Sequence, residues 1–130
     1  LDLVGNALSE LGRKAEAKAA LQRSLEVDPR YALAHHDLGT VLETGNAEEV
    51  ERALKCYETA IALDPDLFWA YYAAGCIHAR AGRTAEALHL IEQALEKGMR
   101  DFEHIEKDAD LNSLRQDGRF VELMGRYQKG

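Results

Sequence analysis

Apolar residues recur every three or four positions along most of the chain, and polar residues fill the positions between them. The first such run holds Val4, Leu8 and Leu11, and the second holds Ala17 and Leu21. This spacing places the apolar side chains along one side of an α-helix. The pattern therefore predicts a series of amphipathic helices.

Glycine and proline mark the expected ends of these helices. The pattern is interrupted at Gly12, Gly45 and Gly82, and proline follows aspartate at Pro29 and Pro65. Proline cannot continue a helix and restrains the residue before it, and glycine often closes a helix. Each of the three units that these two prolines delimit is therefore predicted to be a helical hairpin that turns at its glycine.

The hairpins repeat at a nearly constant period. Residues 12–17 read GRKAEA and residues 82–87 read GRTAEA, while Gly5 to Gly39 spans 34 residues and Gly39 to Gly75 spans 36. Periods of this size are typical of solenoids, in which similar units stack on one another. The repetition predicts an interaction scaffold but does not identify its partner.

The pattern resembles the tetratricopeptide repeat over roughly residues 1–98. The matching small residues are Gly5, Gly39 and Gly75, with Ala17, Ala53 and Ala87, where the two helices of a hairpin cross. The resemblance implies an all-α, right-handed superhelical solenoid of antiparallel helix hairpins. The expected hairpins are residues 1–29, 30–65 and 66–98; the first begins inside its first helix, and Met99 stands where a proline is expected.

Residues 99–130 lie beyond the last repeat and are predicted to be a capping segment of the same structural domain. Their apolar residues suggest one short helix, a turn and a final helix. Terminal repeats need such a cap because stacking otherwise leaves an apolar surface in water. The segment also resembles the tails of bacterial members of the family, which favours a bacterial source.

The second unit carries two extra residues, since Gly39 to Ala53 spans 14 positions and Gly75 to Ala87 spans 12. Asn46, with Glu49 three residues later, has the chemistry of a helix N-cap with a reciprocal acid. We expect the second helix of this hairpin to start early. A longer loop is the alternative.

The overall charge and the two cysteines exclude several classes of protein. The formal charge of −7 disfavours nucleic-acid binding, and Cys56 and Cys76 lack metal-type spacing. The sequence shows no apolar run long enough to span a bilayer and no basic-then-apolar leader. We therefore expect a cytoplasmic protein, although the start at Leu1 leaves an upstream targeting segment open.

The sequence contains no complete catalytic or metal-binding motif. Asp108, Asp110 and Asn112 resemble the start of a calcium loop, but Ser113 and Arg119 replace the glycine and glutamate that the loop needs. Capping acids are the favoured interpretation, and His35 and His78 are expected to be packed, hydrogen-bonded residues. The sequence predicts no enzyme, no cofactor and no metal.

The resemblance also implies where a partner would bind, because the first helix of each hairpin usually lines the concave surface. The expected groove residues are Asn6, Glu10, His36, Thr40, Glu43, Trp69, Tyr72, Cys76 and Arg80, with Leu33 on the same helix face. Aromatic and arginine side chains often dominate binding energy. The alternative for Trp69 and Tyr72 is packing against the preceding hairpin or the C-terminal cap.

The expected function is non-catalytic binding of a peptide or partner protein in the groove. Capture of a chaperone's C-terminal carboxylate is disfavoured, since of the five positions that would hold it only Asn6 agrees. A ligand with apolar anchors and some basic residues fits the acidic chain better. The alternatives are self-association through the uncapped N-terminal helix and a regulatory module of a larger enzyme.

Overall fold

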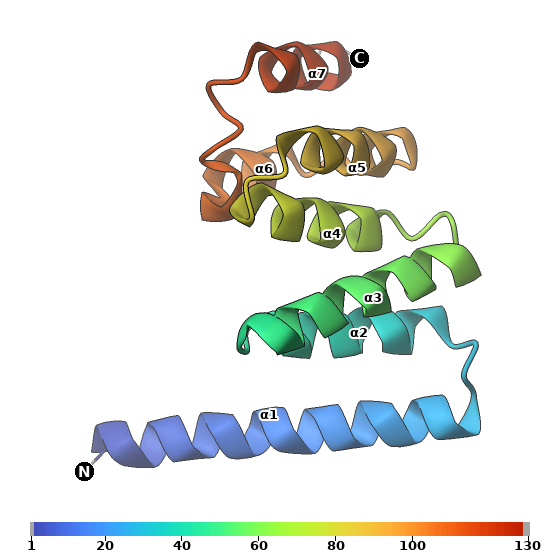
Figure 1. The fold of residues 1–130 in the computed structure, drawn as a ribbon, viewed down its shortest axis with the longest axis vertical. Coiled ribbons are helices and arrows are strands. Elements are labelled where there is room, and N and C mark those ends of the chain that lie inside the picture. The colour runs from blue at the N-terminus through green and yellow to red at the C-terminus, as the bar shows by residue number, and fades with distance from the viewer. Residues whose placement is uncertain (1, 129–130) are drawn as a thin grey trace. The chain divides into compact units, whose positions relative to one another are not determined.

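The computed structural model describes the backbone of residues 2–128 and the side chains of residues 12–128, and within that part the regular elements are all helices (Figure 1). The predicted all-α fold class is confirmed. The chain divides into two compact units, residues 1–63 and 64–130. No helix among the described residues is both long and apolar enough to cross a membrane.

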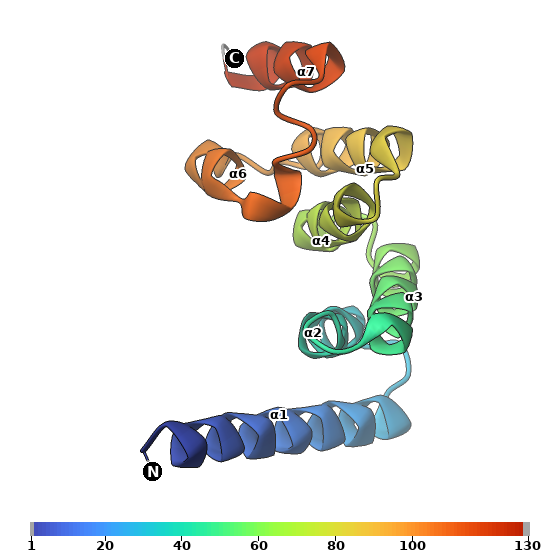
Figure 2. The same ribbon diagram turned by 60° about the vertical axis from the view of Figure 1, so that its left-hand side comes forward.

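The first unit holds the helices α1 (Asp2–Val27), α2 (Ala32–Leu42) and α3 (Ala47–Leu63). The second unit holds α4 (Phe68–Arg80), α5 (Thr84–Glu96), α6 (Phe102–Lys107), a 3-10 helix η1 (Ala109–Leu111) and α7 (Gly118–Gln128). Both ribbon views show α2 beside α3 and α4 beside α5 (Figure 1, Figure 2). These two pairs are hairpins at the positions that the repeat predicts.

Small residues let the helices of each pair approach closely. A Cβ atom added at Gly39 would lie 2.8 Å from Cε1 of Tyr57, and one added at Gly75 would lie 3.1 Å from Cγ1 of Ile91. Ala53 and Ala87 have no exposed surface. The crossing positions assigned from the sequence therefore hold in both hairpins.

Polar residues at core positions of the repeat are hydrogen-bonded, as expected for His35 and His78. The Nε2 atom of His35 lies 2.8 Å from the carbonyl oxygen of Pro29, and the Tyr71 hydroxyl donates to the carbonyl of Pro65 over 2.8 Å. Arg83 donates from Nε to Nδ1 of His78 over 2.7 Å. Each hydrogen bond satisfies a side-chain polar atom whose burial without a partner would destabilise the fold.

The early start of α3 is confirmed. Its first residue is Ala47, and the Glu49 backbone N–H donates to Oδ1 of Asn46 over 2.9 Å. The pKa of Glu49 is lowered, mainly by hydrogen bonding from the Asn46 backbone. The two residues thus form the reciprocal cap that the sequence predicts.

The predicted turn at Gly12 is wrong, because α1 runs unbroken through this residue. A glycine inside a helix costs only about 1 kcal/mol relative to alanine, and the neighbouring alanine, lysine and glutamate residues are strong helix formers. Gly82, which holds the same place in the third repeat, has a φ angle of +80° and ends α4. Residues 2–27 therefore form one long helix where a hairpin was expected.

The residues after α5 form the short helix, turn and final helix that the sequence predicts, with η1 as an added turn. Gly98, with a φ angle of +114°, ends α5, and the Met99 N–H donates to the carbonyl of Ala94 over 3.1 Å. Four of the core side chains of this C-terminal cap (residues 99–128) have no exposed surface: Met99, Ile105, Leu111 and Leu114. The cap is therefore an integral part of the second unit.

The start of α7 makes the stability of the second unit dependent on pH. Asp117 accepts hydrogen bonds from the side chain and the backbone N–H of Arg119, and these bonds lower the pKa of Asp117. A carboxylate with a lowered folded pKa stabilises the fold above its unfolded pKa of about 3.9, and this contribution is lost as the pH falls through the folded pKa.

We expect Asp117→Asn to lower the melting temperature at neutral pH and to have little effect near the acid end of the range. Asparagine caps helices as well as aspartate does, so the substitution removes the charge and keeps the cap. Thermal melts of both proteins at a series of pH values provide the measurement. An equal difference at every pH would show that the Asp117 charge does not stabilise the fold.

Candidate functional site

Three of the expected groove residues lie on the solvent-exposed side of α2 and at its C-terminal end. Thr40 is exposed, and His36 and Glu43 are partly exposed. Leu33 on the same side keeps 45% of its surface exposed. The Thr40 hydroxyl donates to the carbonyl of His36 over 3.1 Å, one turn back along the helix. We call these four residues the α2 face.

The hydroxyl of Tyr57 organises the polar part of the α2 face. Tyr57 comes from α3 and is fully buried, and its ring lies against Gly39, where a side chain would block it. Its hydroxyl donates to Oε2 of Glu43 over 2.9 Å and lies 3.3 Å from Oγ1 of Thr40. The ring also packs at 5.4 Å from His36. Burial raises the pKa of Tyr57, so the hydroxyl stays protonated and donates.

We expect Tyr57→Phe to reduce the free energy of unfolding by about 1–2 kcal/mol, because Glu43 and Thr40 lose their shared partner while the ring remains. Urea unfolding followed by circular dichroism provides the measurement. Thr59→Ala, on the exposed side of the same helix, is the matched control and should change little. A Tyr57→Phe protein as stable as the parent would contradict the role given to the hydroxyl.

The other four described groove candidates share one side of α4, as their spacing predicts, and we call them the α4 face. This side is covered by the C-terminal cap of the same unit. Trp69 and Tyr72 pack against the ring of His104 with centroid distances of 5.6 and 5.5 Å. Arg80 lies 3.7 Å from a carboxylate oxygen of Asp110. Packing against the cap, one of the two alternatives for Trp69 and Tyr72, is thus present in the structure.

Asp108 is the central acceptor of this contact. Its Oδ2 atom accepts from the Tyr72 hydroxyl at 2.6 Å and from the Cys76 thiol at 3.6 Å, and it lies 3.6 Å from Nε2 of His104. Its Oδ1 atom accepts from the Asp110 N–H at 3.0 Å and so caps η1, as the sequence suggests for these acids. Burial raises the pKa of Tyr72 and of Cys76, and the Asp108 charge adds to the effect on the thiol.

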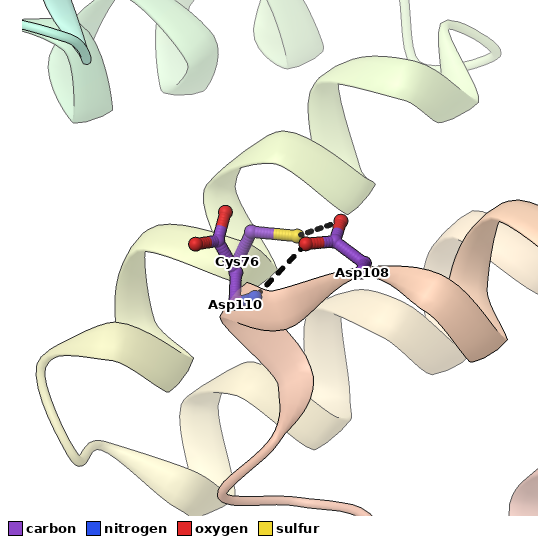
Figure 3. Close-up of side chains that lie close together, drawn as sticks. All are labelled: Cys76, Asp108 and Asp110. Carbon is purple, nitrogen blue, oxygen red and sulfur yellow. Dashed lines mark hydrogen bonds between the residues drawn. The ribbon is translucent and has the colours of Figure 1, made fainter.

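One group of described side chains has ligand atoms close enough for a metal ion. The Cys76 sulfur and carboxylate oxygens of Asp108 and Asp110 all lie within 4.8 Å of one another (Figure 3). In this structure the Asp108 carboxylate accepts from the Tyr72 hydroxyl and the Cys76 thiol, and Asp110 is paired with Arg80. The arrangement is therefore that of a hydrogen-bonded helix contact, which fastens the cap to α4.

The structure leaves the expected residues unequally accessible. Tyr72 and Cys76 are buried at 4% and 5% exposure, whereas Trp69 keeps 36% of its surface and the side chain of Arg80 keeps 37%. Asn6 and Glu10 lie outside the residues whose side chains are described. The α2 face is thus the more open of the two.

Two features of the site were missed by the sequence reasoning. Tyr57 belongs to the core of the second hairpin, yet its hydroxyl emerges beside Glu43. The sequence signal for this contact is a tyrosine at the position that faces the helix glycine. The third repeat has Ile91 at the corresponding position, which carries no hydroxyl. Asp108 was recognised as a capping acid, but its bonds to α4 join residues 32 and 36 positions apart. No local pattern predicts such contacts.

Comparison with known proteins places the chain among repeat proteins. A family model described as TPR repeat matches residues 47–82, and one described as tetratricopeptide repeat matches residues 1–31 and 70–96. The crystal structure of MamA superimposes with a TM-score of 0.62 and 32% identity, over 72% of this chain and 53% of that one.

Two curated plant proteins are also similar, both from Arabidopsis thaliana. A chloroplastic protein is 26% identical over 112 residues, which are 84% of this chain and 33% of that protein. A probable UDP-N-acetylglucosamine–peptide N-acetylglucosaminyltransferase, SPINDLY, is 33% identical over 90 residues, which are 69% of this chain and 10% of the enzyme. The chain thus spans a third or less of these curated relatives.

The matched repeats, the glycine and alanine crossings in two hairpins and the likeness to MamA agree with one another. A scaffold of this kind generally carries protein interactions rather than catalysis. The chain belongs to the tetratricopeptide-repeat family of protein-interaction modules.

Proposed function

We propose that this chain binds a partner protein through a peptide segment that lies along the α2 face. The observation that supports this most is the placement of the Glu43 carboxylate, which the Tyr57 hydroxyl holds in position from within the core. A preorganised polar group costs less entropy on binding than a mobile one. Glu43 therefore acts as a fixed acceptor for the ligand.

The chemistry of the face indicates the kind of peptide. Leu33 offers an exposed apolar contact, and Glu43 offers a negative charge on a chain whose net charge is −7. A peptide with an apolar anchor and a lysine or arginine complements both. On α4, Trp69 and Arg80 keep enough exposed surface to contact a ligand, while Tyr72 and Cys76 contribute by holding the cap.

Selection from a random peptide display library, followed by fluorescence anisotropy, tests this function. We expect selected peptides to be rich in basic residues and to bind Glu43→Gln and Leu33→Ala about tenfold more weakly than the parent, a loss of about 1.4 kcal/mol. Glutamine can still accept from Tyr57, so the first variant removes the charge and keeps the contact. Val121→Ala, at a position 59% exposed on α7, is the control.

Equal affinity of the selected peptides for the parent and for Glu43→Gln would refute binding at the α2 face. Peptides that instead lose affinity with Trp69→Ala would move the site to α4. Melting curves of every variant keep a loss of binding distinct from a loss of folding.

A second candidate function is that of a regulatory module within a larger enzyme. The similarity to SPINDLY, of which this chain covers only 10%, supports it. Under this proposal the α2 face would hold a substrate protein or another part of the enzyme. A regulatory module requires a catalytic domain in the same protein, whereas peptide binding does not. The sequence that flanks this chain in its gene therefore distinguishes the two functions.

A further inference from the structure

The unbroken α1 leaves uncovered a helix face that is buried in the third repeat. The two repeats correspond with a constant offset of 70, so Ala17 matches Ala87 and Leu21 matches Ile91. In α5 the residues of this face, Ala87, Ile91, Ala94 and Leu95, have no exposed surface because α4 covers them. In α1 the matching Ala17, Leu21, Ser24 and Leu25 are all partly or fully exposed.

The same face continues into a hollow at the end of α1. The hollow has a volume of about 460 Å³ and is lined by Ala20, Arg23, Ser24, Val27, Asp28 and Tyr31. Val27 keeps 88% of its surface exposed and Tyr31 keeps 50%. These residues extend the exposed side of α1 beyond Leu25.

Residues 2–11 cannot cover this face while α1 is straight. Residues 5 and 17 lie about 18 Å apart along a helix, at a rise of about 1.5 Å per residue. The two segments nevertheless complement each other in charge. Residues 2–11 carry two acids and no base, for a charge of −2, whereas residues 12–27 carry four bases and two acids, for a charge of +2.

We propose that residues 2–11 of a second copy cover Ala17 and Leu21 on this face, in a dimer formed by exchange between two straight α1 helices. In the third repeat Gly75 lies against Ala87, so Gly5 is expected to lie against Ala17. These two positions are centred on residue 11. An antiparallel pair of α1 helices related by a two-fold axis beside that residue therefore makes every hairpin contact twice, once on each side of the axis.

Engineered cysteines distinguish the exchanged dimer from a closed hairpin. A Cβ atom at Gly75 would lie 3.4 Å from Cβ of Leu90, close to the usual separation in a disulfide, and the matching pair in the first repeat is Gly5 and Ala20. The test uses Gly5→Cys with Ala20→Cys in a background where Cys56 and Cys76 are alanine. Oxidation should give a covalent dimer on a non-reducing gel.

A disulfide within one chain, or no disulfide, would overturn the proposal. Circular dichroism of the reduced protein must match that of the parent, so that a failure to cross-link is not a failure to fold. Light scattering of the unmodified chain should show a dimer that dissociates on dilution. A monomer at every concentration would also overturn the proposal.

Discussion

Leu111→Ala is expected to reduce the free energy of unfolding of the second unit by about 2–5 kcal/mol, the range measured for leucine truncation in packed cores. Leu111 lies in η1 and has no exposed surface. Its loss leaves a cavity beneath the turn that carries Asp108 and Asp110. The same substitution should therefore also loosen the contacts of these acids with α4.

The chain has a single tryptophan, which offers a local readout of this effect. Trp69 packs on His104 of the cap, so its fluorescence reports on the second unit during urea unfolding. Because the chain divides into two compact units, this signal is compared with circular dichroism of the whole chain to test whether both unfold together. Val121→Ala at an exposed site is the control. A midpoint shared by Leu111→Ala and the control would mean that the cap does not stabilise the repeat.

The hairpins were predictable because local and tertiary preferences agree in them. Gly39 and Ala53 stand where close helix crossing requires small residues, and Asn46 and Glu49 cap α3 with chemistry readable from four residues. Such features depend on short-range spacing. They are therefore visible in the sequence.

The first repeat shows the limit of that reasoning. Gly12 and Gly82 sit in nearly identical sequences, yet of these two glycines Gly82 adopts a positive φ angle and Gly12 does not. A glycine inside a helix costs only about 1 kcal/mol relative to alanine. Contacts elsewhere can tip so small a balance, so the local sequence does not decide it.

The candidate site divides in the same way. The spacing of Trp69, Tyr72, Cys76 and Arg80 correctly predicts that they share one side of α4. Whether that side is open to solvent depends on the cap, whose Asp108 accepts a hydrogen bond from Tyr72 of α4. A contact over 36 positions follows from the packing of the whole unit and not from the residues around either partner.

Gly39→Ala tests the most restrictive contact of the first unit and is expected to reduce the free energy of unfolding by about 1–3 kcal/mol through overpacking. The new Cβ atom would lie 2.8 Å from Cε1 and 2.9 Å from Cζ of Tyr57. The tyrosine is fully buried and its hydroxyl is bonded to Glu43, so the ring has little room to move. The α2 face should be disturbed together with the core.

Two other glycines serve as matched controls for this prediction. Gly125→Ala should raise stability by about 0.5–1 kcal/mol, because helix propensity acts there without a clash. Gly75→Ala should fall between the two, since its nearest side-chain atom, Cγ1 of Ile91, would lie 3.1 Å from the new Cβ atom, farther than the Tyr57 atoms would lie in Gly39→Ala. Urea unfolding followed by circular dichroism ranks the three. If Gly39→Ala were as stable as Gly125→Ala, the Tyr57 ring would not be confined by the helix crossing, and the fixed position of Glu43 would lose its physical basis.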